Sequence, residues 1–519
     1  MKRILTCVAL ADLLLARVWR SLVFTPYGGY HLPNTPTLWD HLAALALLVS
    51  IAAGFWLLWS TIVKCRRPWL LSAGRWLFLT LVALALNSVL SASGITMPSI
   101  SSGLVAMLGY LVAAVCLVTA VFLIRGRSTA VAKWLQILVL LTLPFTAITA
   151  GRSALFVSGL TVNESDGATV RRDPPSQDRS KLQRVVWIVF DEFDRSAAFD
   201  HRPDGLSLPE LDRFASGSLF AENALPPSYE TLRSIPALIT GRMVNSATPR
   251  SPFRLSLDLD GDTEPKDWRH IPNVFTATRD LGGKVGIVGW YHPYCRIYSE
   301  QVDRCVWRSN YPDSVPGELT GQFRSSIRLF ALMTGRSIPL VREILPKFTS
   351  YNANFAAITR DIENEAKTYA ADADLDLVFL HIPSPHLPWI YDPTTGMIDP
   401  HHTGTYYESL QYADSVLGKI RMAMEASGSW ESSVVIVTSD HWWRTGRPGE
   451  RSQSDPGGEP DHRIPFMIKA AVTNPQPVRF EQEFNTVQTK DLIDTIRSAR
   501  GLTNTQIADS LQVLSLPRQ

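Results

Sequence analysis

The sequence predicts an α/β protein in two parts, an N-terminal helical transmembrane bundle followed by a domain with a mostly parallel central sheet covered by helices. Long apolar runs fill the first part of the chain. After residue 184, short runs rich in Val and Ile alternate with amphipathic stretches such as 407–426. Parallel strands buried on both faces have continuous apolar runs of this kind, whereas amphipathic stretches are typical of covering helices.

Composition limits the class of protein. The chain has 519 residues, more than one ordinary domain, and its content of 46% hydrophobic and 19% charged residues is too apolar for a purely soluble enzyme. The net charge is +2, and no stripe of Lys and Arg is set aside for phosphate contacts. We therefore expect no nucleic acid among its partners.

Residues 1–155 are predicted to form the membrane part, with four to five helices. Four stretches are apolar over roughly the 17 to 25 residues that a bilayer core requires: residues 42–63, 76–90, 104–124 and 134–150. A fifth stretch, residues 4–24, is interrupted by Asp12, Arg17 and Arg20. It is either a span whose polar residues face other helices or a helix at the interface.

Charged residues between the spans orient the bundle. Basic residues cluster at 64–75 and 125–133, whereas residues 91–102 carry no charge. By the positive-inside rule, the basic loops are cytoplasmic and the last helix leaves the membrane outward. We expect a multi-pass protein of the cytoplasmic (inner) membrane, with a polar linker over 156–183 and an extracytoplasmic domain over 184–519.

Cysteine usage is consistent with export of the second part. Of the five cysteines, only Cys295 and Cys305 lie in the domain predicted to be exported. These two could close a small loop by a disulfide, and the alternative is a pair of buried thiols.

Polar side chains follow three of the apolar runs. The runs at 185–190, 375–380 and 434–439 lead into Asp191 and Glu192, His381 and His386, and Asp440 and His441. Because the carboxyl ends of parallel strands meet at one edge of a sheet, we expect these side chains to lie together. Carboxylates and imidazoles are metal ligands, so the sequence predicts a metal site at this edge.

The segment 228–242, SYETLRSIPALITGR, resembles the nucleophile turn of the alkaline-phosphatase superfamily, which includes sulfatases, phosphoethanolamine transferases and lipoteichoic-acid synthases. In those families the nucleophile stands nine residues before the Thr of a Thr-Gly pair, and counting back from Thr240 reaches Thr231. The alternative is that Thr231 caps a helix, with Ser228 and Ser234 as other available hydroxyls.

Further segments resemble the superfamily in its own order. They are Asp191 after the first strand, the Pro-His-x-Pro-aromatic segment around His386, the Ser-Asp-His that ends on His441, and His462 three residues before a proline. The resemblance covers about residues 184–500 and implies a sulfatase-like catalytic domain. The preceding bundle resembles the membrane-anchored phospho-group transferases of the superfamily.

The resemblance also implies roles for individual residues. Asp191, Thr231, Asp440 and His441 would hold one divalent cation, with Zn²⁺, Mn²⁺ and Ca²⁺ all compatible with oxygen and nitrogen ligands. Thr231 would be the nucleophile, and His386 would act on the leaving group. Whether a second cation binds is left open, because Ile382 stands where two-metal relatives have an Asp. Further candidates for substrate or second-metal contacts are His462, Glu192, His381 and His292.

Departures from the sulfatase pattern narrow the expected reaction. Sulfatases mature a Cys or Ser at the nucleophile position, where this chain has Thr231, and Trp290 replaces the sulfate-binding Lys of their Gly-Lys-Trp-His segment. We expect a transferase or hydrolase of phosphate esters that acts on membrane lipids, or on lipid-linked or envelope-glycan substrates. The alternatives are a sulfuric-ester hydrolase and a non-catalytic receptor for an envelope ligand.

Overall fold

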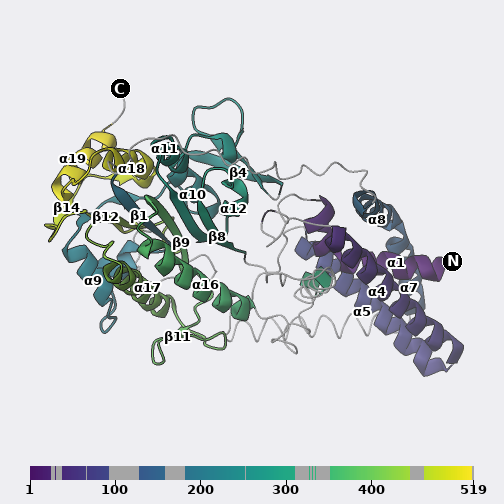
Figure 1. Cartoon of the computed structure of the whole chain (residues 1–519). Coiled ribbons are helices and arrows are strands. Elements are labelled where there is room, and N and C mark those ends of the chain that lie inside the picture. The colour runs from purple at the N-terminus through teal and green to yellow at the C-terminus, as the bar shows by residue number, and fades with distance from the viewer. Residues whose placement is uncertain are drawn as a thin grey trace. The chain divides into compact units, whose positions relative to one another are not determined.

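The computed structural model describes residues 1–24, 30, 38–65, 67–92, 128–157, 182–251, 253–309, 326–327, 330, 333–334, 351–444 and 461–516. These residues fall into two compact units. The first contains the N-terminal helices together with the described residues between 326 and 334, and the second contains the described residues of 182–309 and 351–516. Figure 1 shows helices alone in the first unit and a sheet flanked by helices in the second, which confirms the predicted fold class.

The helices of the first unit are long and apolar. They are α4 (Leu38–Cys65), α5 (Pro68–Ala92), α7 (Ser128–Leu141) and α8 (Leu143–Val157). By length and composition, three helical stretches could cross a membrane: Leu38–Cys65, Pro68–Leu90 and Thr129–Leu155. They correspond to three of the predicted spans. The predicted span at 104–124, most of the predicted linker at 156–183 and a large part of 310–350 lie outside the described residues.

Residues 4–24 are helical, in three short segments: α1 (Lys2–Leu14), α2 (Ala16–Trp19) and η1 (Arg20–Phe24). This stretch is not one of the three membrane-length helices. Its Asp12 is fully buried in the unit, and the Thr149 hydroxyl on α8 donates to Asp12 Oδ1 at 2.9 Å. Arg20 Nη1 donates to the Ala92 carbonyl at 2.6 Å. Asp12 and Arg20 thus contact other helices of this unit. That residues 4–24 span the membrane stays a prediction.

The second unit is built on an eight-stranded sheet with the order β14-β2-β13-β12-β1-β9-β7-β8. Its strands are β1 (Arg184–Asp191), β2 (Leu219–Ala221), β7 (Val285–Trp290), β8 (Arg304–Arg308), β9 (Leu377–Pro385), β12 (Ser433–Ser439), β13 (Phe466–Lys469) and β14 (Val478–Phe480). The five neighbours from β12 to β8 run parallel, and β13 runs antiparallel to β12. The carboxyl ends of the five parallel strands therefore share one edge.

Helices cover both faces of the sheet. One face of β1, with Val186, Ile188 and Phe190, packs in a common core with α9 (Pro209–Ser216), α16 (Tyr351–Ala371) and α17 (Tyr406–Ala426). On the other face, Trp187 packs against Phe379, which also contacts Phe275 of α11 (Val274–Asp280). This face is also covered by α10 (Thr231–Thr240), α18 (Thr489–Ser498) and α19 (Asn504–Ser515). Every residue of β1 is buried, as its continuous apolar run predicts.

Smaller elements complete the second unit. They are β3 (Ala224–Leu225) paired with β15 (Phe484–Asn485), β10 (Tyr391–Asp392) paired with β11 (Met397–Ile398), the sheet of β4 (Val244–Ser251), β5 (Arg254–Leu259) and β6 (Lys266–Asp267), the one-turn helix α12 (Tyr294–Ile297), and the short helices η3 (Ser196–Asp200), η4 (Trp268–His270) and η5 (Thr486–Gln488).

Strand β9 is longer than the run at 375–380 suggested. It continues through His381 to Pro385, and its register against β1 shifts where β1 ends. Val189 pairs with His381 and Phe190 with Ile382, and Asp191 then pairs with Pro385. His381 therefore lies inside the strand and not after it.

Candidate metal centre and active site

Three buried side chains converge at the carboxyl edge of the parallel strands. Asp191 ends β1, the middle one of three neighbouring strands, Asp440 follows β12 on one side of it, and His381 comes from β9 on the other side. One ligand atom from each lies within 4.8 Å of the other two. Two carboxylates and an imidazole at these separations could hold one divalent cation.

The burial of this group fits a cation. Among the described residues, Asp191 Oδ1, Asp440 Oδ2 and His381 Nε2 are buried without a hydrogen-bond partner. Burial, and then the charge of Asp440, raises the pKa of Asp191 well above its usual range. Burial likewise raises the pKa of Asp440, although a hydrogen bond from Thr231 opposes the shift. Unpaired buried carboxylates are costly, and a bound cation would offset that cost.

Thr231 lies beside the two carboxylates. It is the first residue of α10 and is 5% exposed. Its Oγ1 is 3.4 Å from Asp191 Oδ2 and 3.3 Å from His441 Nε2. The two other hydroxyls of this segment are placed differently: Ser234 donates to the Ser228 carbonyl at 2.9 Å, and the Ser228 Oγ is buried without a partner among the described residues.

His441 directs one ring nitrogen at the centre. Its Nδ1 is 2.9 Å from the Trp442 carbonyl, so Nδ1–H is the donor and Nε2 keeps its lone pair. That Nε2 lies 3.5 Å from Asp440 Oδ2 and 3.8 Å from Asp191 Oδ1. Burial, and then the charge of Arg444, lowers the pKa of His441 to about 3. The imidazole is therefore neutral near pH 7, as a metal ligand must be.

An ion pair borders the centre. Glu192 Oε1 accepts hydrogen bonds from Arg444 Nε at 3.0 Å and from Nη2 at 2.8 Å. The Glu192 backbone N–H donates to Asp440 Oδ1 at 3.2 Å. Glu192 does not belong to the group of possible metal ligands, Asp191, His381 and Asp440. Its side chain forms an ion pair with Arg444 instead. The sequence reasoning missed Arg444, and the available signal was a basic residue shortly after the predicted ligand His441.

The remaining candidate histidines have separate surroundings. His292 is fully buried, and its Nε2 lies 3.1 Å from the Thr231 carbonyl oxygen. His386 is half-buried, its backbone N–H donates to the Asp191 carbonyl at 3.1 Å, and its ring packs edge-on to Trp290. His462 is exposed and stacks on Trp442 with ring centroids 4.1 Å apart. The structure thus brings His292 and His386 to residues of the centre and His462 to its rim.

Two residues at this edge have an unusual backbone conformation. Glu192 after β1 has φ 63°, and Tyr291 after β7 has φ 65°. Positive φ costs a residue with a Cβ about 1–3 kcal/mol, and such strain is concentrated at functional sites. Each residue adjoins a candidate site residue, Asp191 in the first case and His292 in the second.

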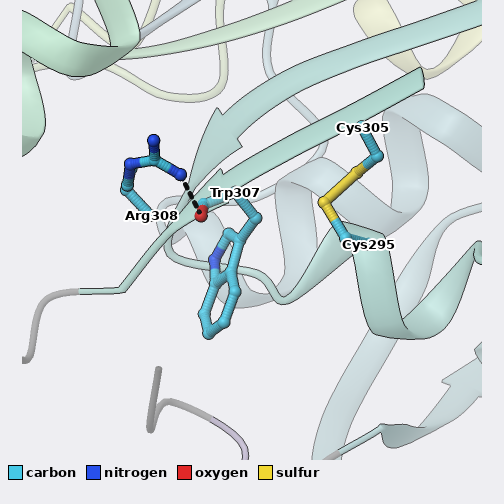
Figure 2. Close-up of a disulfide and its surroundings, with 4 residues drawn as sticks. All are labelled: Cys295, Cys305, Trp307 and Arg308. Atoms are coloured by element: carbon cyan, nitrogen blue, oxygen red, sulfur yellow. Dashed lines mark hydrogen bonds between the residues drawn. A yellow bond between two sulfur atoms is a disulfide. The ribbon is translucent and has the colours of Figure 1, made fainter. Parts of the chain in front are cut away.

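A disulfide joins the segment after β7 to the neighbouring edge strand β8. The sulfur atoms of Cys295 and Cys305 are 2.10 Å apart, and Figure 2 shows the bond joining α12 to strand β8. A bridge of this kind persists in an oxidising compartment.

The comparison with protein families then identifies the chain. Residues 183–502, more than half of its length, match the sequence profile described as Sulfatase. The chain belongs to the sulfatase family. Sulfatase-family proteins are metal-dependent enzymes that hydrolyse or transfer ester groups, and the buried Asp191, His381 and Asp440 group could supply the metal site. No curated protein sequence matches this sulfatase-family chain closely enough to count as a relative.

Solved structures of the alkaline phosphatase superfamily resemble it at low identity. PsFucS1 sulfatase from Pseudoalteromonas sp. is 13% identical, with 62% of this chain and 70% of that chain covered and a TM-score of 0.42. Phosphonate monoester hydrolase of Agrobacterium radiobacter is 14% identical, with coverages of 59% and 72% and a TM-score of 0.37. The lipoteichoic acid synthase LtaP from Listeria monocytogenes is 16% identical, with coverages of 66% and 79% and a TM-score of 0.38.

Proposed function

We propose that this sulfatase-family chain is a membrane-anchored, metal-dependent enzyme that transfers or hydrolyses phosphate esters through Thr231. The observation that carries the proposal is the position of the Thr231 hydroxyl. It lies 3.4 Å from Asp191 and 3.3 Å from His441, next to the group that could bind a cation. A hydroxyl needs such surroundings to lose its proton and become a nucleophile.

Asp191, Asp440, His381 and His441 are the residues that would hold the cation. A bound divalent cation lowers the pKa of a neighbouring hydroxyl and neutralises negative charge on a phosphoryl group. Thr231 then attacks phosphorus through Oγ1 as the bond to the leaving oxygen breaks. In this proposal His386, which is half-buried and whose backbone N–H donates to the Asp191 carbonyl, gives the departing oxygen a proton. Attack by water or by an acceptor hydroxyl then breaks the bond from phosphorus to Thr231 and restores the threonine.

The N-terminal helices favour a substrate in or near the membrane. Three helices could cross a membrane, and the loop charges favour export of the second unit. We therefore propose lipids, lipid-linked intermediates or envelope glycans as substrates, on the outer side of the cytoplasmic membrane. Thin-layer chromatography of a lipid extract after incubation separates the outcomes, since a transferred headgroup and a hydrolysed one leave different products.

Substitution of the nucleophile tests the mechanism. Thr231→Ala in the purified chain should lower turnover of an aryl phosphodiester by about a thousandfold or more. Thr231→Ser is the matched control, because it keeps the hydroxyl and should keep part of the activity. Metal content should stay close to that of the wild type in both variants, since Asp191 and Asp440 remain. Full activity of Thr231→Ala would reject threonine as the nucleophile.

Sulfuric-ester hydrolysis is the second candidate, and the family match favours it. Against it, the nucleophile position holds Thr231, which cannot be matured as a Cys or Ser is in sulfatases, and Trp290 stands in place of the sulfate-binding Lys. Faster turnover of an aryl sulfate than of the matched aryl phosphate would establish this alternative. A chain that binds no divalent cation would instead support the non-catalytic receptor.

A further inference from the structure

Tyr294 makes a buried contact with the candidate metal centre that the sequence reasoning did not anticipate. Its Oη lies 2.8 Å from Nδ1 of His381, and both side chains are fully buried. The other nitrogen of His381, Nε2, lies 3.8 Å from Asp191 Oδ2. Tyr294 therefore contacts a candidate ligand on the side of its ring that faces away from the centre.

The Tyr294 hydroxyl can accept a hydrogen bond from Nδ1–H of His381 or donate one to an unprotonated Nδ1, and the two neutral forms of His381 differ in which nitrogen is left free. A neutral imidazole carries its proton on one nitrogen, and only the other nitrogen can bind a metal. At 3.8 Å, Nε2 is too far from Asp191 Oδ2 for a hydrogen bond, and it is unpartnered among the described residues. Placing the proton on Nδ1, as a donor to the Tyr294 oxygen, leaves the Nε2 lone pair facing the carboxylates.

Close packing holds the tyrosine ring in this position. A Cβ added at Gly289 in β7 would lie 2.7 Å from Tyr294 Cε2 and 3.2 Å from His381 Cβ. The ring also packs edge-on against Phe379, and the Tyr294 backbone N–H donates to the His292 carbonyl at 2.8 Å. Gly289 therefore makes room for the ring, and any larger residue there would displace it.

The backbone of Tyr294 is fixed as well. The next residue, Cys295, is bonded to Cys305 of β8, the strand that runs parallel to β7 (Figure 2). In the same short helix, the Arg296 guanidinium lies 4.5 Å from the centre of the Trp307 ring, also on β8. Two contacts with the edge strand thus hold the turn that carries Tyr294.

We propose that Tyr294 is a positioning residue of the metal centre. It accepts a hydrogen bond from Nδ1–H of His381 and so presents the Nε2 lone pair to a cation held by Asp191 and Asp440. The disulfide and Gly289 keep the tyrosine where it can do this. The inference rests on the metal centre of the proposed function and adds a determinant of metal affinity.

The test is the affinity of the full-length chain for Mn²⁺ and Zn²⁺, measured by titration calorimetry in detergent after removal of bound metal. Tyr294→Phe should weaken binding by about 10- to 100-fold, the usual effect of losing a partner of a metal-bound histidine. Tyr298→Phe is the matched control. Tyr298 is also fully buried and lies one turn further on, but it packs on Trp268 and Phe275.

A double substitution separates positioning from a general structural effect. In a His381→Ala background, Tyr294→Phe should weaken binding no further, because the residue through which it acts is gone. The proposal is overturned if Tyr294→Phe binds metal as the wild type does, if Tyr298→Phe weakens binding equally, or if the two effects add. A wild-type chain that binds neither cation also overturns it.

The readout is metal affinity, so the inference and the proposed reaction can fail separately. An inactive wild type whose affinity still depends on Tyr294 would reject the reaction and keep the inference. An active wild type whose metal affinity does not depend on Tyr294 would keep the proposed reaction and reject the inference.

Discussion

At the residue scale, the balance of charge around the centre depends on Arg444. It is the cation paired with Glu192, and its charge opposes the rise that burial causes in the pKa values of Asp191 and Asp440. The Glu192 side chain is 7% exposed and that of Arg444 is 35% exposed. Loss of the guanidinium would therefore leave a buried carboxylate unpaired beside two others, which is strongly destabilising.

Arg444→Gln should accordingly destabilise the second unit by about 2 kcal/mol, a value below that for a fully buried pair because Arg444 is partly exposed. Its thermal unfolding midpoint should fall by several degrees. The double variant Glu192→Gln with Arg444→Gln should recover most of the loss, since no unpaired charge remains. Equal midpoints for the single and double variants would contradict this account of the pair.

The sequence predicted some of these residues better than others. Asp191 and Asp440 stand where continuous apolar runs stop, and the spacing to a Thr-Gly pair singled out Thr231. The structure places all three together. Tyr294 carried no such signal, and the signal for Arg444 was only a basic residue shortly after His441, because both depend on contacts with residues far away in sequence, Glu192 and His381. Periodicity and spacing do not reveal contacts of that kind.

At the element scale, α9 depends on α17 for its N-terminal cap. The N-cap position of α9 is Leu208, which has no capping side chain, and Asp414 of α17 accepts from the Leu211 backbone N–H at 2.8 Å. Burial raises the pKa of Asp414 to about 6, although the backbone hydrogen bonds oppose the shift. Asp414 therefore serves as a cap in either protonation state, and its charged form is the less favourable one.

Two substitutions at this position separate the cap from the charge. Asp414→Ala should cost about 1 kcal/mol of unfolding free energy near pH 4, because the cap is lost. Asp414→Asn keeps the acceptor. Since the folded pKa exceeds the unfolded one, the wild type binds more protons when folded and loses stability as the pH rises from about 4 to 6. In urea unfolding, the Asp414→Asn variant should have the same free energy of unfolding as the wild type near pH 4 and a higher one at pH 7. A difference between the two proteins that does not change with pH would contradict the raised pKa of Asp414.

The elements themselves were largely predictable. The amphipathic stretch 407–426 corresponds to α17 (Tyr406–Ala426), and the runs before Asp191 and Asp440 correspond to β1 and β12. The antiparallel direction of β13 and the extension of β9 were not predicted. Both depend on pairing with strands distant in sequence, and an apolar run does not encode the direction or register of its partner.

At the scale of the whole molecule, the prediction concerns the side of the membrane on which the second unit lies. We expect it outside, because the positive-inside rule assigns the basic loops to the cytoplasm. Protease added to intact spheroplasts should therefore degrade a C-terminal tag, whereas a cytoplasmic marker protein stays intact. The same tag should be protected in inverted membrane vesicles. A tag that is protected in spheroplasts and cleaved in inverted vesicles would contradict the predicted orientation.

The position of Thr231 as the first residue of α10 has a practical consequence. The first backbone N–H groups of a helix lack carbonyl partners within the helix and stabilise negative charge nearby. A phosphoryl group carried by Thr231 would thus be held where α10 begins, and it should persist when no acceptor is supplied and water attacks slowly. Acid quenching during turnover, followed by peptide mass spectrometry, should then find the covalent adduct on the peptide that contains Thr231.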